Sequence, residues 1–218
     1  MTDYLKDYDD FIAECRAGWE LIQQMPLAEL KWRAAVISDI INIDIDGQIP
    51  DVKTNMIAEG VEVFINDVDG DGWKWYFTRS GKSLLLALRH ESCCNTFDLH
   101  LDENKNYHEL LSNFDGVPSE MVSMAQIPAG IMEHSCYHVS STGDMLQAVS
   151  GIFWHDGAGW HIADGTLRRH QETGEDVMVD LSLIIGDLSL GEELTVERCV
   201  ELALPAVVNE IFRRREKP

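Results

Sequence analysis

The sequence predicts a single α+β domain spanning residues 1–218, in which an N-terminal helical pair and a C-terminal helix pack on one side of a mainly antiparallel, curved sheet. Apolar residues recur at three- and four-residue steps near both ends of the chain, which predicts helices there. Apolar and polar residues alternate through the middle, and turn residues separate these segments, which predicts strands. We expect a helical part over 1–50, a sheet-rich part over 61–185 and a C-terminal helix over 195–215.

Two helices are expected at the N-terminus. Residues 4–24 predict an amphipathic helix, because apolar side chains recur on one face and acidic residues fall between them. Pro26 suits the first turn of a second helix, whose apolar stripe continues to Ile41. The short connection predicts that the two helices form an antiparallel pair.

The segment from Val61 to Thr78, VEVFINDVDGDGWKWYFT, predicts a β-hairpin at the centre of the sheet. Two apolar runs flank a loop of Asn, Asp and Gly, which is typical of this motif. Because side chains alternate across a strand, each arm places three large apolar residues on one face: Val61, Val63 and Ile65 on the first, and Trp73, Trp75 and Phe77 on the second.

The remaining elements follow from alternation and turn residues. Asn106 and Glu109 resemble a capping pair that opens a short helix, and Pro205 is expected to kink or divide the C-terminal helix beginning near Thr195. Further strands are expected at 83–90, 96–101, 131–140 and 160–163, with 176–185 as the last strand. Residues 145–154 fit a strand or a helix, and a strand is preferred because a Gly-rich turn connects them to 160–163.

Charge is the outstanding global feature of the chain. The sequence carries 38 acidic and 17 basic residues, a formal net charge of −21, and the acids are spread along its whole length. A field of this sign repels nucleic acid and anionic membranes and attracts basic partners, although an acidic surface also simply keeps a protein soluble. The five cysteines are unevenly spaced, and the N-terminus lacks the apolar region of a signal peptide. We therefore expect reduced thiols and a cytoplasmic location.

The hairpin loop carries three aspartates, Asp67, Asp69 and Asp71, which match the opening half of an EF-hand calcium loop. The match ends there, because Thr78 stands where the bidentate Glu is required and the flanking segments predict strands. Turn formation explains these residues, and a looser carboxylate cage is the alternative. A further interpretation combines the three aspartates with Trp73 and Trp75 as a partner-binding patch with aromatic anchors.

Histidines suggest a second kind of site. All eight fall between residues 90 and 170, and the segment EHSCYH places His134, Cys136 and His138 on one face of a predicted strand. Two imidazoles and a thiolate are suitable zinc ligands. The alternative is a polar strand face without metal. A fourth ligand could come from Cys93, Cys94, His155 or His161.

The segment GAGWHIADGT, residues 157–166, resembles the Gly-Trp, strand and Asp element of transglutaminase-like cysteine enzymes. The resemblance covers fewer than a dozen residues. It implies a histidine about one strand before the tryptophan, where this chain reads AVSGIF and so offers no general base.

The sequence lacks the P-loop, dinucleotide-binding, nucleophile-elbow and HExxH signatures. We therefore expect no catalytic residues and no cofactor, and interpret the chain as an acidic cytosolic binding or inhibitor protein that neutralises a basic protein partner. A bacterial immunity protein against a nuclease-type toxin and a nucleic-acid mimic are examples of that class. The alternatives are a metal- or thiol-dependent hydrolase that uses the His/Cys cluster, with zinc as its cofactor, and an acidic subunit of a larger assembly.

Overall fold

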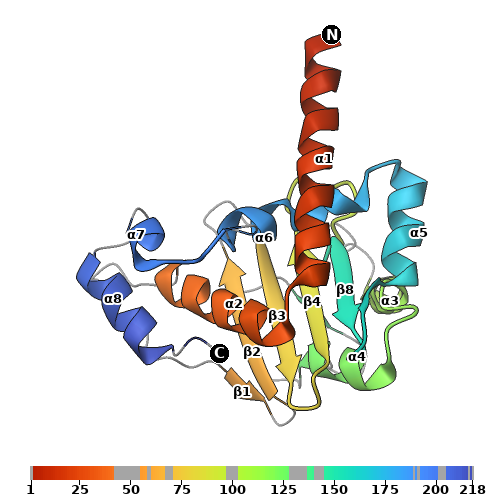
Figure 1. Ribbon diagram of the computed structural model, residues 1–218. Coiled ribbons are helices and arrows are strands. Elements are labelled where there is room, and N and C mark those ends of the chain that lie inside the picture. The colour runs from red at the N-terminus through yellow and green to blue at the C-terminus, as the bar shows by residue number, and fades with distance from the viewer. Residues whose placement is uncertain are drawn as a thin grey trace.

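The computed structural model describes residues 2–41, 55–57, 60–66, 71–96, 103–127, 137–139, 145–188, 190, 192–200, 205–215 and 217. Within these residues an open antiparallel sheet is covered by helices, so the predicted α+β class is confirmed (Figure 1). Among the described helices, none is both long and apolar enough to cross a lipid bilayer.

The first half of the chain contributes two helices and four strands: α1 (Thr2–Gln24), α2 (Leu27–Ile41), β1 (Asn55–Ile57), β2 (Gly60–Asn66), β3 (Gly72–Thr78) and β4 (Ser83–Leu88). The middle alternates short elements: α3 (Glu103–Ser112), α4 (Ser119–Ala125), β5 (Gln126–Ile127), β6 (Tyr137–Val139), β7 (Met145–Gln147), β8 (Gly151–His155) and β9 (Trp160–Ile162). The last part is helical: α5 (Asp164–Thr173), the 3₁₀ helix η2 (Val177–Leu181), α6 (Ser182–Asp187), α7 (Val196–Cys199) and α8 (Pro205–Arg214).

The main sheet has the strand order β1-β2-β3-β4-β8-β9, and each neighbouring pair is antiparallel. The predicted central hairpin is confirmed in its register, because Val63 pairs with Trp75 and Ile65 with Trp73. Strands β8 and β9 pair as a hairpin, with Phe153 opposite Ile162, but the single strand expected over 145–154 is divided between β7 and β8, which belong to different sheets. Strands β5, β7 and β6 form a separate small sheet.

One face of the main sheet carries the larger apolar core, and α1, α2, η2 and α6 contribute to it. Trp75 lies at its centre with no exposed surface. Its ring stacks on Phe77 at a centroid distance of 5.0 Å and meets the edge of Trp160 at 5.8 Å. This is the face that the sequence pattern assigned to the aromatic side chains of the hairpin.

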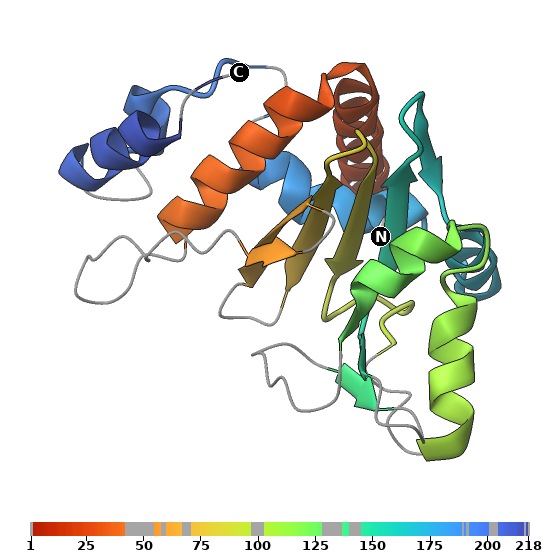
Figure 2. The same ribbon diagram turned by 90° about the horizontal axis from the view of Figure 1, so that it is seen from below.

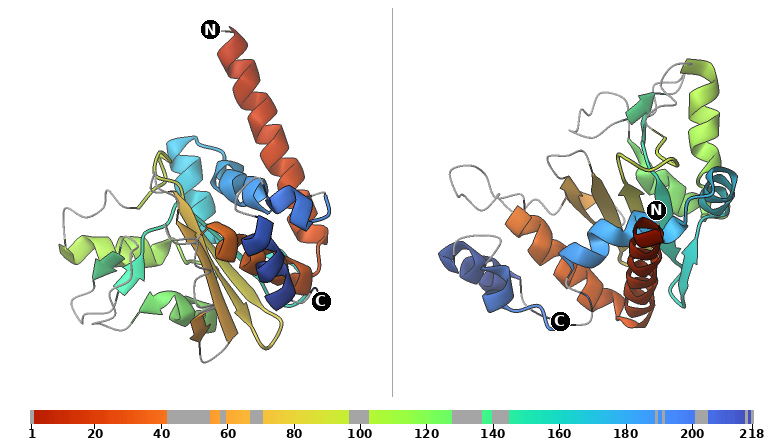
Figure 3. Two further views of the ribbon diagram at one scale, coloured as in Figure 1. Left: turned by 90° about the vertical axis from the view of Figure 1, so that its left-hand side faces the viewer. Right: turned by 90° about the horizontal axis from the view of Figure 1, so that it is seen from above.

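The opposite face of the sheet is also covered, which the sequence analysis did not anticipate. Tyr76, Leu84, Leu86 and Ile152 point to this side and form a second core with residues of α3 and α4. Figures 2 and 3 show the sheet between the two sets of helices. Both faces of β3 and β4 are therefore buried, which explains their nearly continuous apolar sequences.

The N-terminal helices form as predicted, but they do not run antiparallel. They point in clearly different directions after the turn at Met25 and Pro26 (Figures 1 and 2). Helix α1 packs against η2 and α6, whereas α2 packs against β2 and α8. The N-terminal part of α1 extends beyond the rest of the molecule (Figure 1).

Helix α8 is fixed on α2 by polar and aromatic contacts. Arg215 forms a two-point ion pair with Asp39, with nitrogen–oxygen distances of 2.8 and 3.0 Å. Trp32 donates its indole N–H to the main-chain oxygen of Arg215 and meets the ring of Phe212 edge-on. Helix α7 ends at Cys199 and α8 begins at Pro205, which agrees with a C-terminal helical region in two segments, and residues 201–204 lie outside the described part.

The segment 176–185 is helical, so the predicted last strand is wrong. The Asp176 carboxylate accepts the main-chain N–H of Met178 and caps η2, which continues directly into α6. The apolar residues of this run reach the core from helical turns. In so short a run, the alternation of apolar and polar residues does not distinguish a strand from a buried helix.

Two further predictions need correction. The order of the expected strands along the chain would place 96–101 beside β4 in an antiparallel meander, but β8 pairs with β4 at that position. Residues 97–101 themselves lie outside the described part of the chain. Helix α3 begins at Glu103, so Asn106 lies within the helix and does not open it. Of the predicted strand 131–140, only 137–139 is described, and it is a strand.

Candidate functional site

The two tryptophans of the predicted partner-binding patch do not lie on the surface. Trp73 is 1% exposed and Trp75 is 0% exposed, so neither side chain can touch a partner. Both point into the core, where Trp75 donates its indole N–H to Ser83. Asp71 is half-buried, and its carboxylate accepts the main-chain N–H of His90. Asp67 and Asp69 lie outside the described residues.

The predicted zinc ligands His134 and Cys136 also lie outside the described residues. His138 is in β6, although its side chain is not described. The proposed fourth ligands belong to opposite ends of β4. Because Ser83 pairs with His155, the β8–β9 turn with His155 and His161 lies at the start of this strand. Cys93 and Cys94 follow its end.

The segment 157–166 forms the β8–β9 turn, β9 and the start of α5. His161 in this segment stacks on Trp154 at a centroid distance of 4.3 Å and lies 3.1 Å from the Asp156 carboxylate. The described residues thus place no thiol in this turn. The thiol that lies beside an imidazole is that of Cys94, which follows the opposite end of β4 from this turn.

The structure assembles a cluster that the sequence analysis did not identify, consisting of Cys94, His170, Glu175 and Asp180. We refer to these four residues as the thiol–imidazole cluster. Cys94 lies in the turn after β4, His170 in the last turn of α5, Glu175 just beyond α5, and Asp180 in η2. One potential ligand atom each from Cys94, His170 and Glu175 lies within 4.8 Å of the others.

His170 is held from both sides of its ring. Its Nε2 lies 2.8 Å from a carboxylate oxygen of Asp180, and its Nδ1 lies 3.2 Å from the main-chain oxygen of Glu175. Both His170 and Asp180 are 3% exposed. Burial opposes a charged ring, but hydrogen bonding to Asp180 and Cys94 outweighs it and raises the pKa of His170 to about 10. The pair therefore carries a proton at neutral pH.

Short turns position the thiol and the carboxylate of Glu175. Ser92 donates its hydroxyl to Oε2 of Glu175 at 2.6 Å and accepts the main-chain N–H of Cys94 at 3.1 Å. The Cys94 sulfur lies 3.0 Å from the hydroxyl of Thr173. Since Cys94 is 0% exposed, a substrate cannot reach this sulfur as a nucleophile. The geometry instead suits a buried polar centre or a closed metal site.

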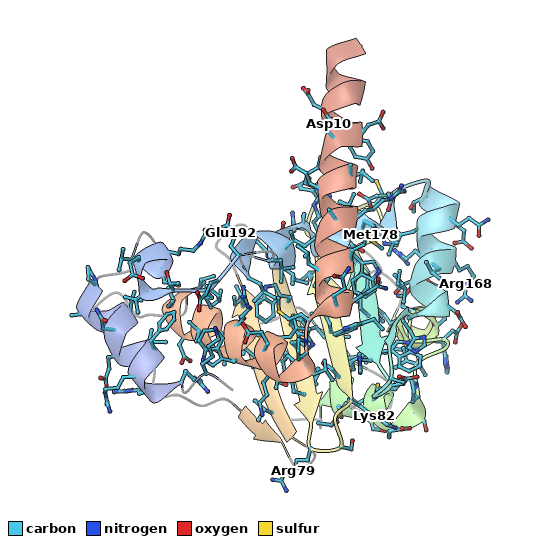
Figure 4. All side chains as sticks on the ribbon, in the orientation of Figure 1. Asp10, Arg79, Lys82, Arg168, Met178 and Glu192 are labelled. Carbon is cyan, nitrogen blue, oxygen red and sulfur yellow. The ribbon has the colours of Figure 1, made fainter. Side chains whose placement is uncertain are left out.

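A second feature is the row of exposed carboxylates along α1. Each of these side chains is solvent-exposed, and the nearby Arg16 pairs with Asp176 instead. Among the side chains that the structure describes, which do not include that of Lys6, no cation lies within ion-pair distance of them. They are Asp7, Asp9, Asp10, Glu14 and Glu20. Figure 4 shows Asp10 on the part of α1 that extends beyond the body.

Several other surface carboxylates are neutralised locally, in contrast to those of α1. Such ion pairs join Glu120 to Lys82, Asp115 to Arg168, Glu193 to Lys217, and Glu210 to both Arg213 and Arg214. An exposed aromatic side chain, Tyr8 at 41% exposure, lies among the α1 acids. The sequence signal for this surface was the acidic spacing of the N-terminal helix. Comparison of the chain with protein-family models, curated proteins and solved structures found no match.

Proposed function

We propose that this protein binds a basic protein partner through the exposed carboxylates of α1. We define the α1 acidic face as Asp7, Asp9, Asp10 and Glu14. The observation that supports this proposal most directly is that these carboxylates are exposed on the part of α1 that extends from the body, where the structure describes no ion pair to them and the sequence offers Lys6 alone as a neighbouring cation. A net charge of −21 adds a long-range attraction for cationic surfaces.

Spacing along the helix makes this face costly in the isolated protein. Asp7 and Asp10 are three residues apart, and Asp10 and Glu14 are four apart, so their carboxylates are neighbours on one side of α1. Like charges at these spacings each destabilise a helix by about 0.2–0.5 kcal/mol. A basic partner removes this repulsion and replaces it with attraction.

Tyr8 supplies an apolar anchor within the charged surface. Tyrosine is enriched at interface hot spots, because a large rigid side chain buries much area at a small entropy cost. With 3.6 residues per turn, Tyr8 lies on the flank of α1 between Asp7 and Asp9, whereas Asp10 and Glu14 lie round the helix from it. The α1 surface thus has the composition that the sequence analysis wrongly assigned to Trp73 and Trp75.

Proteins that bind nucleic acid present the complementary cationic surface. A nuclease-type toxin is one such protein, and an immunity or inhibitor role in the cytoplasm is the corresponding function of this chain. The competing explanation is that the carboxylates of α1 serve only solubility. If the carboxylates form an interface, partner binding depends on their position on α1. If they serve only solubility, their total number matters and their position does not.

A pair of charge-matched variants separates them. The first neutralises the helix in the triple change Asp7→Asn, Asp9→Asn and Asp10→Asn. The control removes the same number of exposed charges elsewhere, in the triple change Glu91→Gln, Glu109→Gln and Glu172→Gln. Both variants have the same net charge. The unmodified protein and each variant are immobilised and incubated at low salt with a lysate of the organism that makes this protein. The captured proteins are then eluted with increasing salt.

We expect the unmodified protein and the control to retain a common basic protein that elutes as salt rises. The α1 variant is expected to lose it, and Tyr8→Ala is expected to weaken its retention. Equal retention by both triple variants would show that net charge alone is responsible. Such a result would contradict a specific α1 interface.

A further inference from the structure

We propose that Cys94, His170 and Glu175 bind a zinc ion. Cys94 lies in the turn after β4, His170 lies in the last turn of α5, and Glu175 lies just beyond α5. The fold brings a sulfur, an imidazole nitrogen and a carboxylate oxygen within 4.8 Å of one another. Zinc accepts all three ligand types, whereas magnesium and calcium prefer oxygen alone.

The orientation of His170 favours a metal on the side of the ring opposite Asp180. Nε2 is engaged by the Asp180 carboxylate at 2.8 Å, so Nδ1 is the nitrogen that would bind the ion, in exchange for its 3.2 Å contact with the main-chain oxygen of Glu175. Metal-binding histidines commonly donate their other ring N–H to a carboxylate, which fixes the ring and increases its basicity. Asp180 is therefore a positioning residue in this arrangement.

Glu175 has one oxygen suited to the ion. Its Oε2 accepts the hydroxyl of Ser92, whereas Oε1 has a contact of 4.0 Å with the Arg89 guanidinium and no hydrogen bond among the described residues. Its side chain is 16% exposed, while Cys94 is fully buried. An ion can therefore enter from the Glu175 side and reach the sulfur behind it.

The charges of the cluster change when the ion binds. Oδ1 of Asp180 is buried and has no hydrogen-bond partner in the described structure, and the charge of this carboxylate is compensated through its other oxygen by the His170 ring. Asp180 therefore stays on the far side of the ring from the ion. Binding of Zn²⁺ releases the protons of the thiol and of Nδ1, so the thiolate of Cys94 and the carboxylate of Glu175 then face the divalent cation. Three protein ligands leave a further position for water.

Cobalt titration of the full chain tests this inference. Protein stripped with a chelator is titrated with Co²⁺ alone, because a thiolate ligand gives a sulfur-to-cobalt charge-transfer band. Competition with Zn²⁺ then gives the zinc affinity. The variants are Cys94→Ser and, as a nearly isosteric change, Glu175→Gln. The matched control is Cys199→Ser, since Cys199 is buried in α7 outside the cluster.

We expect one ion per chain with a thiolate band that persists in the Cys199→Ser control. Cys94→Ser should abolish the band, and Glu175→Gln should weaken zinc binding by about tenfold or more while keeping it. Absence of stoichiometric Co²⁺ and Zn²⁺ binding by the unmodified chain overturns the inference, whether or not the variants fold. A thiolate band that survives Cys94→Ser and is lost in Cys136→Ser assigns the metal to another site and equally overturns it.

Discussion

The Asp180 carboxylate lies 2.8 Å from Nε2 of His170, and the two side chains join η2 to the end of α5 inside the protein. Removing one member of a buried ion pair leaves the other charge without compensation, which typically costs about 3–5 kcal/mol. We expect Asp180→Ala to lower the free energy of unfolding by that amount when measured by urea denaturation with a chelator present. The contact therefore contributes to stability independently of any metal.

An exposed ion pair provides the comparison for this change. Asp115 pairs with Arg168, and about half of each side chain is exposed to solvent. Asp115→Ala should cost less than about 1 kcal/mol, because solvent screens such pairs. Similar losses for Asp180→Ala and Asp115→Ala would contradict the buried pairing.

Trp75 should be essential for stability and have no direct role in partner binding. Its side chain is fully buried, so Trp75→Ala is expected to lower the free energy of unfolding by about 3–5 kcal/mol. Tyr8→Ala, at an exposed position, should change stability by less than about 0.5 kcal/mol. Thermal or chemical denaturation of the two variants measures the difference, and a mild effect at Trp75 would contradict its central position.

Two helical glycines should respond oppositely to alanine. In α5, a Cβ on Gly165 would lie 1.9 Å from the main-chain oxygen of Ser112, so Gly165→Ala should destabilise the protein by about 1–3 kcal/mol. In α6, a Cβ on Gly186 meets no atom within 4 Å. Gly186→Ala should therefore stabilise the protein by about 0.5–1 kcal/mol through helix propensity. Urea denaturation curves of the two variants provide the measurement, and a shift in the same direction for both would contradict the close α3–α5 contact.

The turn between β8 and β9 should lose stability in acid because of Asp156. Main-chain N–H donors of Ala158 and Gly159, together with His161, lower the pKa of this carboxyl from 3.8 to about 2. The ionised carboxylate therefore stabilises the folded turn above pH 3.8, and this contribution is lost as the pH falls towards 2. An NMR titration should show the low pKa, and Asp156→Asn should flatten the acid dependence of the turn. A carboxyl that titrates near 3.8 would contradict these hydrogen bonds.

The sequence predicted the central hairpin because its pattern is local. Alternation places Val63 and Trp75 on one face, and the turn residues between the arms set their pairing, so neither depends on distant parts of the chain. The segment around Asp180 was misassigned because its apolar run fits a strand or a buried helix equally well. The Asp176 cap and the His170 contact decide between them, and the second of these is a tertiary interaction.

The thiol–imidazole cluster was not predictable from spacing. Cys94 and its neighbour Thr173 are 79 residues apart in the sequence, and no short motif marks either one. The sequence analysis instead concentrated on EHSCYH, where ligand types were adjacent in the chain. Similarly, Trp73 and Trp75 were interpreted both as core residues and as interface anchors. The helices that cover the larger core bury both hairpin tryptophans, which leaves them only the core role.

Burial of β3 and β4 on both sides limits where this protein can change during evolution. Most substitutions in these strands must preserve volume, because most of their apolar side chains lie in one of two packed cores. New recognition properties must therefore arise from the turns at the strand ends and from the outer surfaces of the helices. The α1 acidic face occupies such a position, so it can diverge while the central sheet stays the same, whereas the buried thiol–imidazole cluster is constrained like the cores.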